Sequence, residues 1–499
     1  MKVIKRVLLV FIFLVVILLV SGLVFVHYLA HRGVPAYERE VTLAGIREPV
    51  TVFRDSLAIP HIYASNEEDL YRTVGYIMAQ DRLWQMDLIR RVTTGRLSEI
   101  FGEDFVETDL FLRALRIPEK SKLVLENTSP ELIVLLKAYA DGVNQFIEQH
   151  IHTLPFEFSI LRYNPEPWKP EHSLNIIGYM AWDLAGNILS SEVTIYKLNQ
   201  KFGPEKLYQL IPDVESTESI VYPDFTWDSI SQEIHAEFIK HSRSLMDLGI
   251  AAFHGSNNWA ISGEKSTTGN PIFANDMHLG FGIPGIWYQM HHIIEDKLNV
   301  TGIGIPGEPL IVAGHNDSIA WGMTNLAVDD IDLYLEEVNP GNRNEYRLNG
   351  KWKTMEVREE RINIKGGKEL LKELRFTHRG PVISEFRDMP EVISMRWGGN
   401  DYSNEFRSVY LLNNARNWGD FKNAIKTFSS ISQNFAYVDV QGNIGLYAAG
   451  GIPIRNGTGY SLLPGNTDEY DWKGKVPFED LPHSFNPSSG IVASANNKS

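Results

Sequence analysis

The spacing of apolar residues changes near residue 256, and this change constrains the fold more than any other feature. Between about residues 67 and 95 apolar side chains recur at helical spacing, with Leu70, Val74 and Ile77 on one face. Residues 105–250 are also largely helical in pattern, whereas strand patterns dominate after residue 256. Segregated helices and strands favour layered packing over alternating parallel units. The predicted fold class is therefore α+β.

Several local signals predict where elements begin and turn. Residues 45–64 are typical of strands, and Ser65-Asn66-Glu67-Glu68 is typical of a helix start with an N-cap and acidic first turn. Asn349-Gly350 predicts a tight hairpin between two strands, and Gly366-Gly367 predicts another. These signals are independent of any assumption about function.

Length and charge limit the class of protein. The chain has 499 residues, of which 43% are hydrophobic, so it can bury a large core. Its formal net charge of −15 disfavours binding to nucleic acid, and we expect no nucleic-acid partner. There is no cysteine, which excludes disulfides, thiolate metal sites and a cysteine nucleophile.

The first 33 residues are predicted to be a membrane anchor and not part of the folded body. An almost uninterrupted apolar run from Val7 to Val26 is long enough to span a bilayer. Lys2, Lys5 and Arg6 precede this run and predict a cytoplasmic N-terminus with the rest of the chain outside. The alternative is a cleaved signal peptide and a secreted or periplasmic protein.

The segment His254-Gly255-Ser256-Asn257-Asn258-Trp259 is typical of a self-cleavage point. If the Gly255–Ser256 bond breaks, Ser256 carries both a nucleophilic hydroxyl and a free α-amine with an ordinary pKa of about 7.7–8.0, which can act as its base. A small Gly-Ser step is also common in surface turns, so this motif alone leaves both interpretations open.

Further motifs occur in a fixed order along the chain and together resemble the penicillin acylase family of N-terminal nucleophile (Ntn) hydrolases. The resemblance runs from about residue 45 to the last residue. It rests on Gly75–Asp87 (GYIMAQDRLWQMD), Gly95–Glu99 (GRLSE), Ser256–Trp259 (SNNW), Asn275–Leu279 (NDMHL), Gly314–Asn325 (GHNDSIAWGMTN) and Gly490–Asn497 (GIVASANN).

The resemblance implies a four-layer αββα Ntn-hydrolase fold and a proenzyme that cuts itself. The implied segments are a membrane anchor at 1–33, an α-chain at 34–225, a propeptide at 226–255 and a β-chain at 256–499. Relatives continue further past the last motif, so we expect the β-chain region to be truncated at its C-terminus. The α- and β-chains of one precursor are then each other's partners.

The resemblance also implies the catalytic residues. Ser256 is the expected nucleophile, with its own α-amine as the base, and His278 is expected to orient it. The backbone N–H of Asn325 and the side chain of Asn496 are expected to bind the oxyanion, and cleavage is expected between Gly255 and Ser256.

The substrate pocket is expected to include Gly186, Leu279 and Ala313, where phenylacetyl-specific relatives carry aromatic residues. Small side chains there favour an aliphatic acyl chain. The expected activity is hydrolysis of a linear amide C–N bond in a small N-acyl compound, such as an acyl-homoserine lactone, a lipopeptide or a β-lactam antibiotic.

A structural calcium ion is implied by the same resemblance, with no organic cofactor. The implied ligands are Glu192, Asp329, Asp332 and the carbonyl of Ile331. Oxygen ligands from two segments suit Ca²⁺, which would tie the α- and β-chains together. The alternative is that these acidic residues form a solvated turn.

Two other interpretations remain. His291-His292 with Glu295 could hold a metal, but no His-Glu-x-x-His motif is present and we interpret the pair as exposed helix histidines. The alternative to the acylase is a membrane-anchored binding or scaffold protein of the same fold without catalysis, or an inactive fragment. Self-cleavage that depends on Ser256 distinguishes the two.

Overall fold

The computed structural model describes residues 2–185, positions 192, 195, 196, 198, 199, 201–203, 206, 207 and 209, and residues 255–496 apart from 281, 387–390, 457, 458 and 460. Gly186 and the expected propeptide up to residue 254 lie outside the described residues. The two residues of the expected cleavage site, Gly255 and Ser256, lie within them and are joined in one strand.

Helices dominate the described part before residue 186. They are α1 (Lys2–Arg32), α2 (Glu67–Thr93), α3 (Ser98–Phe101), α4 (Val106–Ala114), α5 (Ile117–Glu126), α6 (Pro130–Gln149), α7 (Phe156–Leu161) and α8 (Pro170–Ala185), followed much later by α12 (Glu405–Asn414) and α13 (Trp418–Ile425).

The described strands lie mostly after residue 255, as the sequence predicts, with two at residues 51–64. They are β1 (Thr51–Arg54), β2 (Pro60–Ala64), β3 (Gly255–Ile261), β4 (Ile272–His278), β5 (Tyr288–Ile294), β6 (Leu298–Gly304), β7 (Ala313–Asn316), β8 (Ile319–Asn325), β9 (Ile331–Glu336), β10 (Val338–Asn339), β11 (Asn342–Leu348), β12 (Lys351–Thr354), β13 (Glu356–Ile364), β14 (Lys368–Phe376), β15 (Val392–Trp397), β16 (Gln433–Asp439), β17 (Ile444–Ala449), β18 (Pro453–Ile454), β19 (Leu463–Pro464), β20 (Gly474–Lys475), β21 (His483–Phe485) and β22 (Ile491–Ser494).

Two sheets form the centre of the molecule. The larger has nine strands in the order β1-β2-β5-β6-β7-β8-β16-β17-β21, and the smaller has three in the order β22-β3-β4. Strand β3 of the small sheet packs on β8 and β16 of the large one. The parallel pairing of β2 with β5 joins the segment before residue 65 to the strands after residue 255. These two sheets are therefore one unit built from both halves of the chain.

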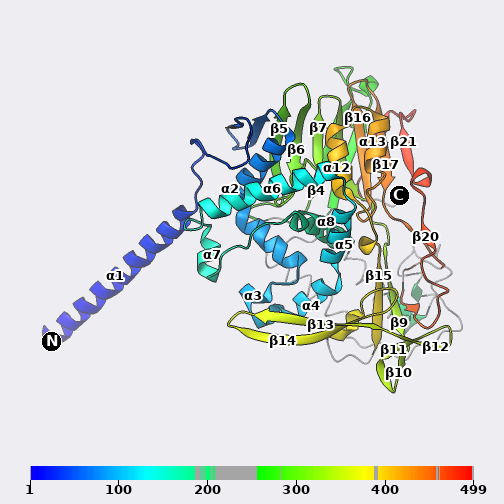
Figure 1. Ribbon diagram of the computed structural model, residues 1–499, viewed down its shortest axis with the longest axis horizontal. Coiled ribbons are helices and arrows are strands. Elements are labelled where there is room, and N and C mark those ends of the chain that lie inside the picture. Colours follow the sequence, from blue (N-terminus) through cyan, green and yellow to red (C-terminus); the bar gives the residue numbers. More distant parts are fainter. Residues whose placement is uncertain are drawn as a thin grey trace.

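Helices α2 and α6 lie side by side next to the large sheet (Figure 1). Two glycines allow this close packing: a Cβ on Gly75 would lie 2.1 Å from the carbonyl oxygen of Tyr139, and a Cβ on Gly142 would lie 1.9 Å from that of Arg72. The layers are therefore, in order, a layer of helices, the large sheet and the small sheet. This mixed content agrees with the predicted α+β class; the complete four-layer αββα arrangement stays a prediction.

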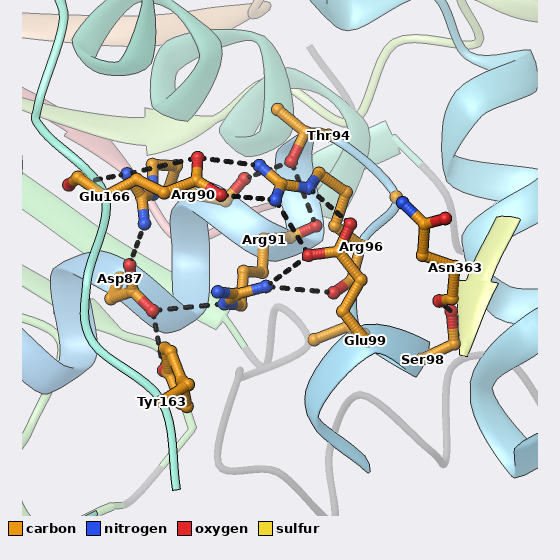
Figure 2. Close-up of polar contacts among 12 residues, drawn as sticks. Asp87, Arg90, Arg91, Thr94, Arg96, Ser98, Glu99, Tyr163, Glu166 and Asn363 are labelled. Carbon is orange, nitrogen blue, oxygen red and sulfur yellow. Dashed lines mark hydrogen bonds and ion pairs between the residues drawn. The ribbon is translucent and has the colours of Figure 1, made fainter. Parts of the chain in front are cut away.

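The end of α2 is held by a network of arginines and carboxylates, shown in Figure 2. Arg91 binds Asp87 at 3.1 Å and Glu99 at 2.8 Å, and Arg96 binds Glu99 at 2.7 Å. Arg96 also binds Glu166 of the connection before α8 at 2.9 Å. Hydrogen bonds from Arg96 lower the pKa of Glu166 to about 2. The network thus fixes the course of the chain into α8, which reaches the active-site region.

Helix α1 projects away from the rest of the molecule (Figure 1). The span Val3–Arg32 has a mean hydropathy of 3.4 in its most apolar window, and none of that window is buried. By length and composition it could cross a membrane, although a signal sequence has the same properties.

Several local predictions are confirmed, and one is wrong. Asn66 caps α2 by accepting a hydrogen bond from the backbone of Asp69, and Asn349-Gly350 joins β11 to β12. Gly366-Gly367 joins β13 to β14. The interpretation of His291-His292 as exposed helix histidines is wrong, because both lie in β5 and His292 is fully buried. This segment is a strand in which buried and less buried side chains alternate, in place of the expected helix.

Candidate active site

The small sheet brings three predicted residues to one point. Ser256 lies near the start of the central strand β3, and β22 runs antiparallel to it with Ser494 opposite Asn258. Continuing that register by two residues places Asn496 beside Ser256. On the other side of β3, His278 at the end of β4 lies opposite Gly255. Residues far apart in the sequence therefore meet because of strand register.

Two N–H groups converge on the hydroxyl of Ser256. The backbone N–H of Asn325, at the end of β8, donates to Ser256 Oγ at 3.2 Å, and Asn496 Nδ2 donates to the same oxygen at 3.3 Å. Asn496 Oδ1 in turn accepts the backbone N–H of Ser256 at 2.6 Å. Ser256 is only 4% exposed and Asn325 only 7%. Fixed donors in a dry site can stabilise negative charge that develops next to the serine.

Asn496 itself is held in an uncommon backbone conformation, with φ of 56°. Its Nδ2 also donates to the carbonyl of Asn325 at 2.9 Å, which links the small sheet to the large one. Asparagine is among the few side chains that tolerate the left-handed region. The same residue therefore satisfies both the backbone conformation and the polar contacts.

His278 lies against the bond that is expected to be cut. A Cβ on Gly255 would lie 2.6 Å from His278 Nε2, so the imidazole occupies the space that any larger residue at position 255 would need. The other ring nitrogen, Nδ1, is 3.1 Å from Asp276 Oδ2. Asp276 was not singled out from the sequence; its signal is the i, i+2 spacing from His278 along one face of a strand.

A polar network that the sequence did not predict fixes the two sheets behind the serine. Ser494 Oγ accepts hydrogen bonds from Thr324 Oγ1 at 2.8 Å and from Asn434 Nδ2 at 3.1 Å. Asn258 Nδ2 donates to the carbonyl of Asn434 at 2.9 Å. These buried contacts between strands of different sheets hold the donors and the serine in place.

An apolar cavity of about 90 Å³ opens beside Ser256. Both Gly255 and Ser256 line it, together with Leu279, one of the residues predicted for the pocket. Ala313 is buried in β7 and does not line this cavity, whereas its neighbour Val312 does. The walls are mainly aliphatic and aromatic, and include Ile176, Met180, Trp287, Leu310 and Phe406.

The acidic residues predicted to bind calcium lie near one another; Glu192 and Asp332 are buried and Asp329 is partly buried. Burial raises the pKa of Glu192 and of Asp329 well above the usual range, and each is raised further by the neighbouring carboxylates. Glu192, Asp329 and Asp332 each retain one oxygen without a hydrogen-bond partner in the described structure. The Ile331 carbonyl belongs to the same segment, at the start of β9.

Carboxylate and carbonyl oxygens are suitable ligands for Ca²⁺, but in this structure the guanidinium of Arg455 lies among them. Arg455 binds Asp329 Oδ2 and Asp332 Oδ2, both at 2.7 Å. Within the described part of the chain, no group of three or more His, Asp or Glu side chains is arranged as a metal site. Burial disfavours the charged form of Glu192 and Asp329, and a divalent cation bound to their unpartnered oxygens could compensate for that effect.

Comparisons with known proteins agree with the family that the sequence motifs resemble. The family model described as penicillin amidase matches residues 49–499. The chain is 30% identical to penicillin acylase 2 proenzyme of Pseudomonas sp. (strain SE83), with 93% of this chain and 61% of that protein covered. It is also 30% identical to the acyl-homoserine lactone acylase QuiP of Pseudomonas aeruginosa, with 91% and 56% covered.

A solved structure, the thermostable penicillin G acylase of Alcaligenes faecalis, is 29% identical over 48% of this chain and 44% of that one, with a TM-score of 0.45. The present chain spans 61% and 56% of the length of the two sequence relatives. Since the family model covers residues 49–499, the chain belongs to the penicillin amidase family.

Proposed function

We propose that this chain is a self-processing acylase that hydrolyses the amide of small N-acyl compounds through an acyl-enzyme on Ser256. The observation that carries the proposal is the convergence of the Asn325 N–H and Asn496 Nδ2 on Ser256 Oγ, at the mouth of an apolar cavity. The names of the two sequence relatives, a penicillin acylase and an acyl-homoserine lactone acylase, support the same reaction class.

Maturation begins at the intact Gly255–Ser256 bond. Ser256 Oγ adds to the carbonyl carbon of Gly255, the C–N bond breaks and the acyl group moves from nitrogen to oxygen. Water then hydrolyses the ester, which leaves a Gly255 carboxylate and a free α-amine on Ser256. His278, next to Gly255, is a positioning residue for this step.

The mature site then acts on an external amide. Ser256 Oγ adds to the substrate carbonyl while the α-amine takes the hydroxyl proton and passes it to the leaving nitrogen. The Asn325 N–H and Asn496 Nδ2 stabilise the oxyanion, and water releases the carboxylic acid from the ester. In the uncut chain Asn496 Oδ1 accepts the Ser256 N–H, so the same oxygen is placed to hold the new amine.

The cavity supports an aliphatic acyl chain as the group that is transferred. Leu279 lines it, and we propose Gly186 as a further determinant of its shape. Acyl-homoserine lactones, lipopeptides and β-lactam antibiotics all contain such an amide, and we propose a compound of this type as the substrate.

Two further properties belong to the proposal. A Ca²⁺ ion held by Glu192, Asp329, Asp332 and the Ile331 carbonyl would compensate buried charge and tie the α-chain to the β-chain. Helix α1 would anchor the protein in a membrane, with the catalytic part outside the cytoplasm.

The test compares hydrolysis of a fatty-acyl p-nitroanilide by the wild type, Ser256→Ala and Ser262→Ala. Ser262 lies on the same chain segment just beyond β3 and serves as the matched control. We expect turnover by the wild type and Ser262→Ala, and none by Ser256→Ala. Equal turnover by wild type and Ser256→Ala would refute Ser256 as the nucleophile.

A further inference from the structure

Two buried polar side chains without partners line the cavity beside Ser256. Glu308 is 4% exposed and Gln433 is 3% exposed. In the described structure, Glu308 Oε1 and Gln433 Nε2 have no hydrogen-bond partner. An unpaired polar group in an apolar wall is costly, so each side chain carries an unused binding group within the wall of this cavity.

The other carboxylate in the cavity wall, Glu405, is different. It accepts hydrogen bonds from the backbone N–H groups of Ser429 and Ser430 at 3.0 and 2.8 Å, and from Ser403 Oγ at 3.0 Å. Glu405 therefore shows that this wall can supply hydrogen bonds to a carboxylate. Glu308 lacks such contacts.

Glu308 is held on a rigid turn. Its backbone N–H donates to the carbonyl of Ile305 at 2.8 Å, and prolines at positions 306 and 309 flank the turn. Ser173 Oγ of α8 donates to the Gly307 carbonyl at 2.6 Å, and the Gly307 N–H donates to Met78 Sδ of α2 at 3.2 Å. These contacts fix the backbone that carries Glu308 against α8 and α2.

Burial raises the pKa of Glu308 well above its usual range, and no neighbouring cation opposes this shift. Burial therefore favours the neutral carboxyl of Glu308 over its carboxylate. A neutral carboxyl group can donate one hydrogen bond and accept another. A hydroxyl or keto oxygen on a bound acyl chain would satisfy it, whereas a plain hydrocarbon chain would leave it unpaired.

We propose that Glu308 is a specificity-determining residue that selects acyl chains bearing a hydroxyl or keto oxygen over unsubstituted chains. The inference rests on the proposed function, because it concerns the acyl group transferred to Ser256. Gln433, which lies opposite Asn325 in the sheet register, offers a second hydrogen-bond donor nearer the nucleophile.

The experiment measures kcat/KM for p-nitroanilides of hexanoic, 3-hydroxyhexanoic, 3-oxohexanoic, 6-hydroxyhexanoic and 6-aminohexanoic acids. The proteins are the full-length wild type, Glu308→Leu, Glu308→Gln and the exposed control Glu295→Leu. We expect the wild type to prefer at least one oxygenated chain over hexanoyl by about tenfold or more, because a site built for a hydrogen bond rejects the analogue that lacks it.

The variants separate the physical causes. Glu308→Leu should abolish or reverse the preference, Glu308→Gln should keep most of it, and Glu295→Leu should match the wild type. A wild-type preference for hexanoyl, or a preference that survives in Glu308→Leu, would overturn the proposal. A preference for the 6-aminohexanoyl chain that Glu308→Gln loses would also overturn it, since that pattern requires a carboxylate.

Binding distinguishes failure of this inference from failure of the proposed reaction. If the wild type hydrolyses none of the anilides, the acylase proposal fails. Calorimetric titration of the corresponding hexanamides into Ser256→Ala, with and without Glu308→Leu, then decides the question. Tighter binding of an oxygenated amide that depends on Glu308 supports the inference, and equal binding of all amides refutes it.

Discussion

At the scale of single residues, the site depends on hydrogen-bond donors that are positioned before any substrate binds. Ser256 Oγ accepts from one backbone N–H and one side-chain amide, and the Asn496 amide also contacts Ser256 N and the Asn325 carbonyl. Donors that are already fixed need no reorganisation when charge develops. Asn496 is therefore the residue whose loss should affect catalysis most, after Ser256.

Replacing Asn496 by alanine tests this role. We expect Asn496→Ala to lower kcat by about 10²–10³, the usual effect of removing one oxyanion donor. Rates are measured on protein already cut at Ser256, so that maturation and turnover are separated. The control is Asn486→Ala, since Asn486 also has positive φ, of 47°, but lies outside the site. A loss below about threefold in cleaved Asn496→Ala would contradict the assigned role.

Residues in motifs were predictable, and residues defined by packing were not. Ser256, Asn325 and Asn496 lie in short segments whose order and spacing resemble those of a family. Glu308 and Gln433 have no such signal, because their importance lies in being buried without partners. That property arises only when distant segments close around one cavity.

At the scale of elements, the interface between β5 and α2 contains an unusual buried histidine. His292 is fully buried, neither ring nitrogen has a partner in the described structure, and its ring lies 5.9 Å from that of Tyr71 of α2. Burial lowers its pKa to about 3. The imidazole therefore stays neutral in the folded protein, whereas the unfolded chain takes up a proton below about pH 6.5.

His292 should make the fold sensitive to acid. The stability of wild type is not reduced by His292 above pH 6.5. As the pH falls from 6.5 toward 3, the free energy of unfolding decreases by up to about 1.4 kcal/mol per pH unit. We expect the free energy of unfolding of His292→Leu minus that of wild type to be about 2 kcal/mol more positive at pH 5 than at pH 8, because only wild type loses this stability in acid. Urea unfolding at both pH values measures this difference.

The control for this measurement is His152→Leu, which removes an exposed histidine. It should leave the pH dependence of the wild type unchanged. If His292→Leu and wild type differ by the same amount at pH 5 and pH 8, the proposed neutral state of His292 is wrong.

The hairpins were predictable from local turn chemistry, since Asn349-Gly350 and Gly366-Gly367 satisfy the positive φ values that their turns require. The strand order of the large sheet was not. It pairs β2 with β5 and β8 with β16, contacts between segments about 100 to 230 residues apart that no local signal encodes. The wrong assignment of the β5 histidines to a helix has the same cause, because local sequence does not encode which strands pair.

For the whole molecule, the two halves of the chain are joined by β2–β5 pairing and by the hydrogen bond from the Leu333 N–H to Glu192 Oε2 at 3.1 Å. If Ca²⁺ binds there, it should stabilise the folded protein by about 2.7 kcal/mol at a hundredfold excess over its Kd. Thermal unfolding with added Ca²⁺ or with a chelator measures the shift.

Two variants make the calcium test specific. Glu192→Gln should abolish the Ca²⁺-dependent rise in Tm, and Glu264→Gln, which alters an exposed carboxylate elsewhere, should keep it. An unchanged Tm for wild type in Ca²⁺ and in chelator would show that Arg455 is the only cation this region needs.

Cleavage of the Gly255–Ser256 bond by Ser256 itself is the step on which the proposed activity depends. Intact mass and N-terminal sequencing of the purified protein measure it. We expect a fragment beginning Ser-Asn-Asn-Trp in the wild type and in Ser262→Ala, and none in Ser256→Ala. A wild-type protein that stays in one piece, or a Ser256→Ala variant cut at the same bond, would show that Ser256 does not process the chain.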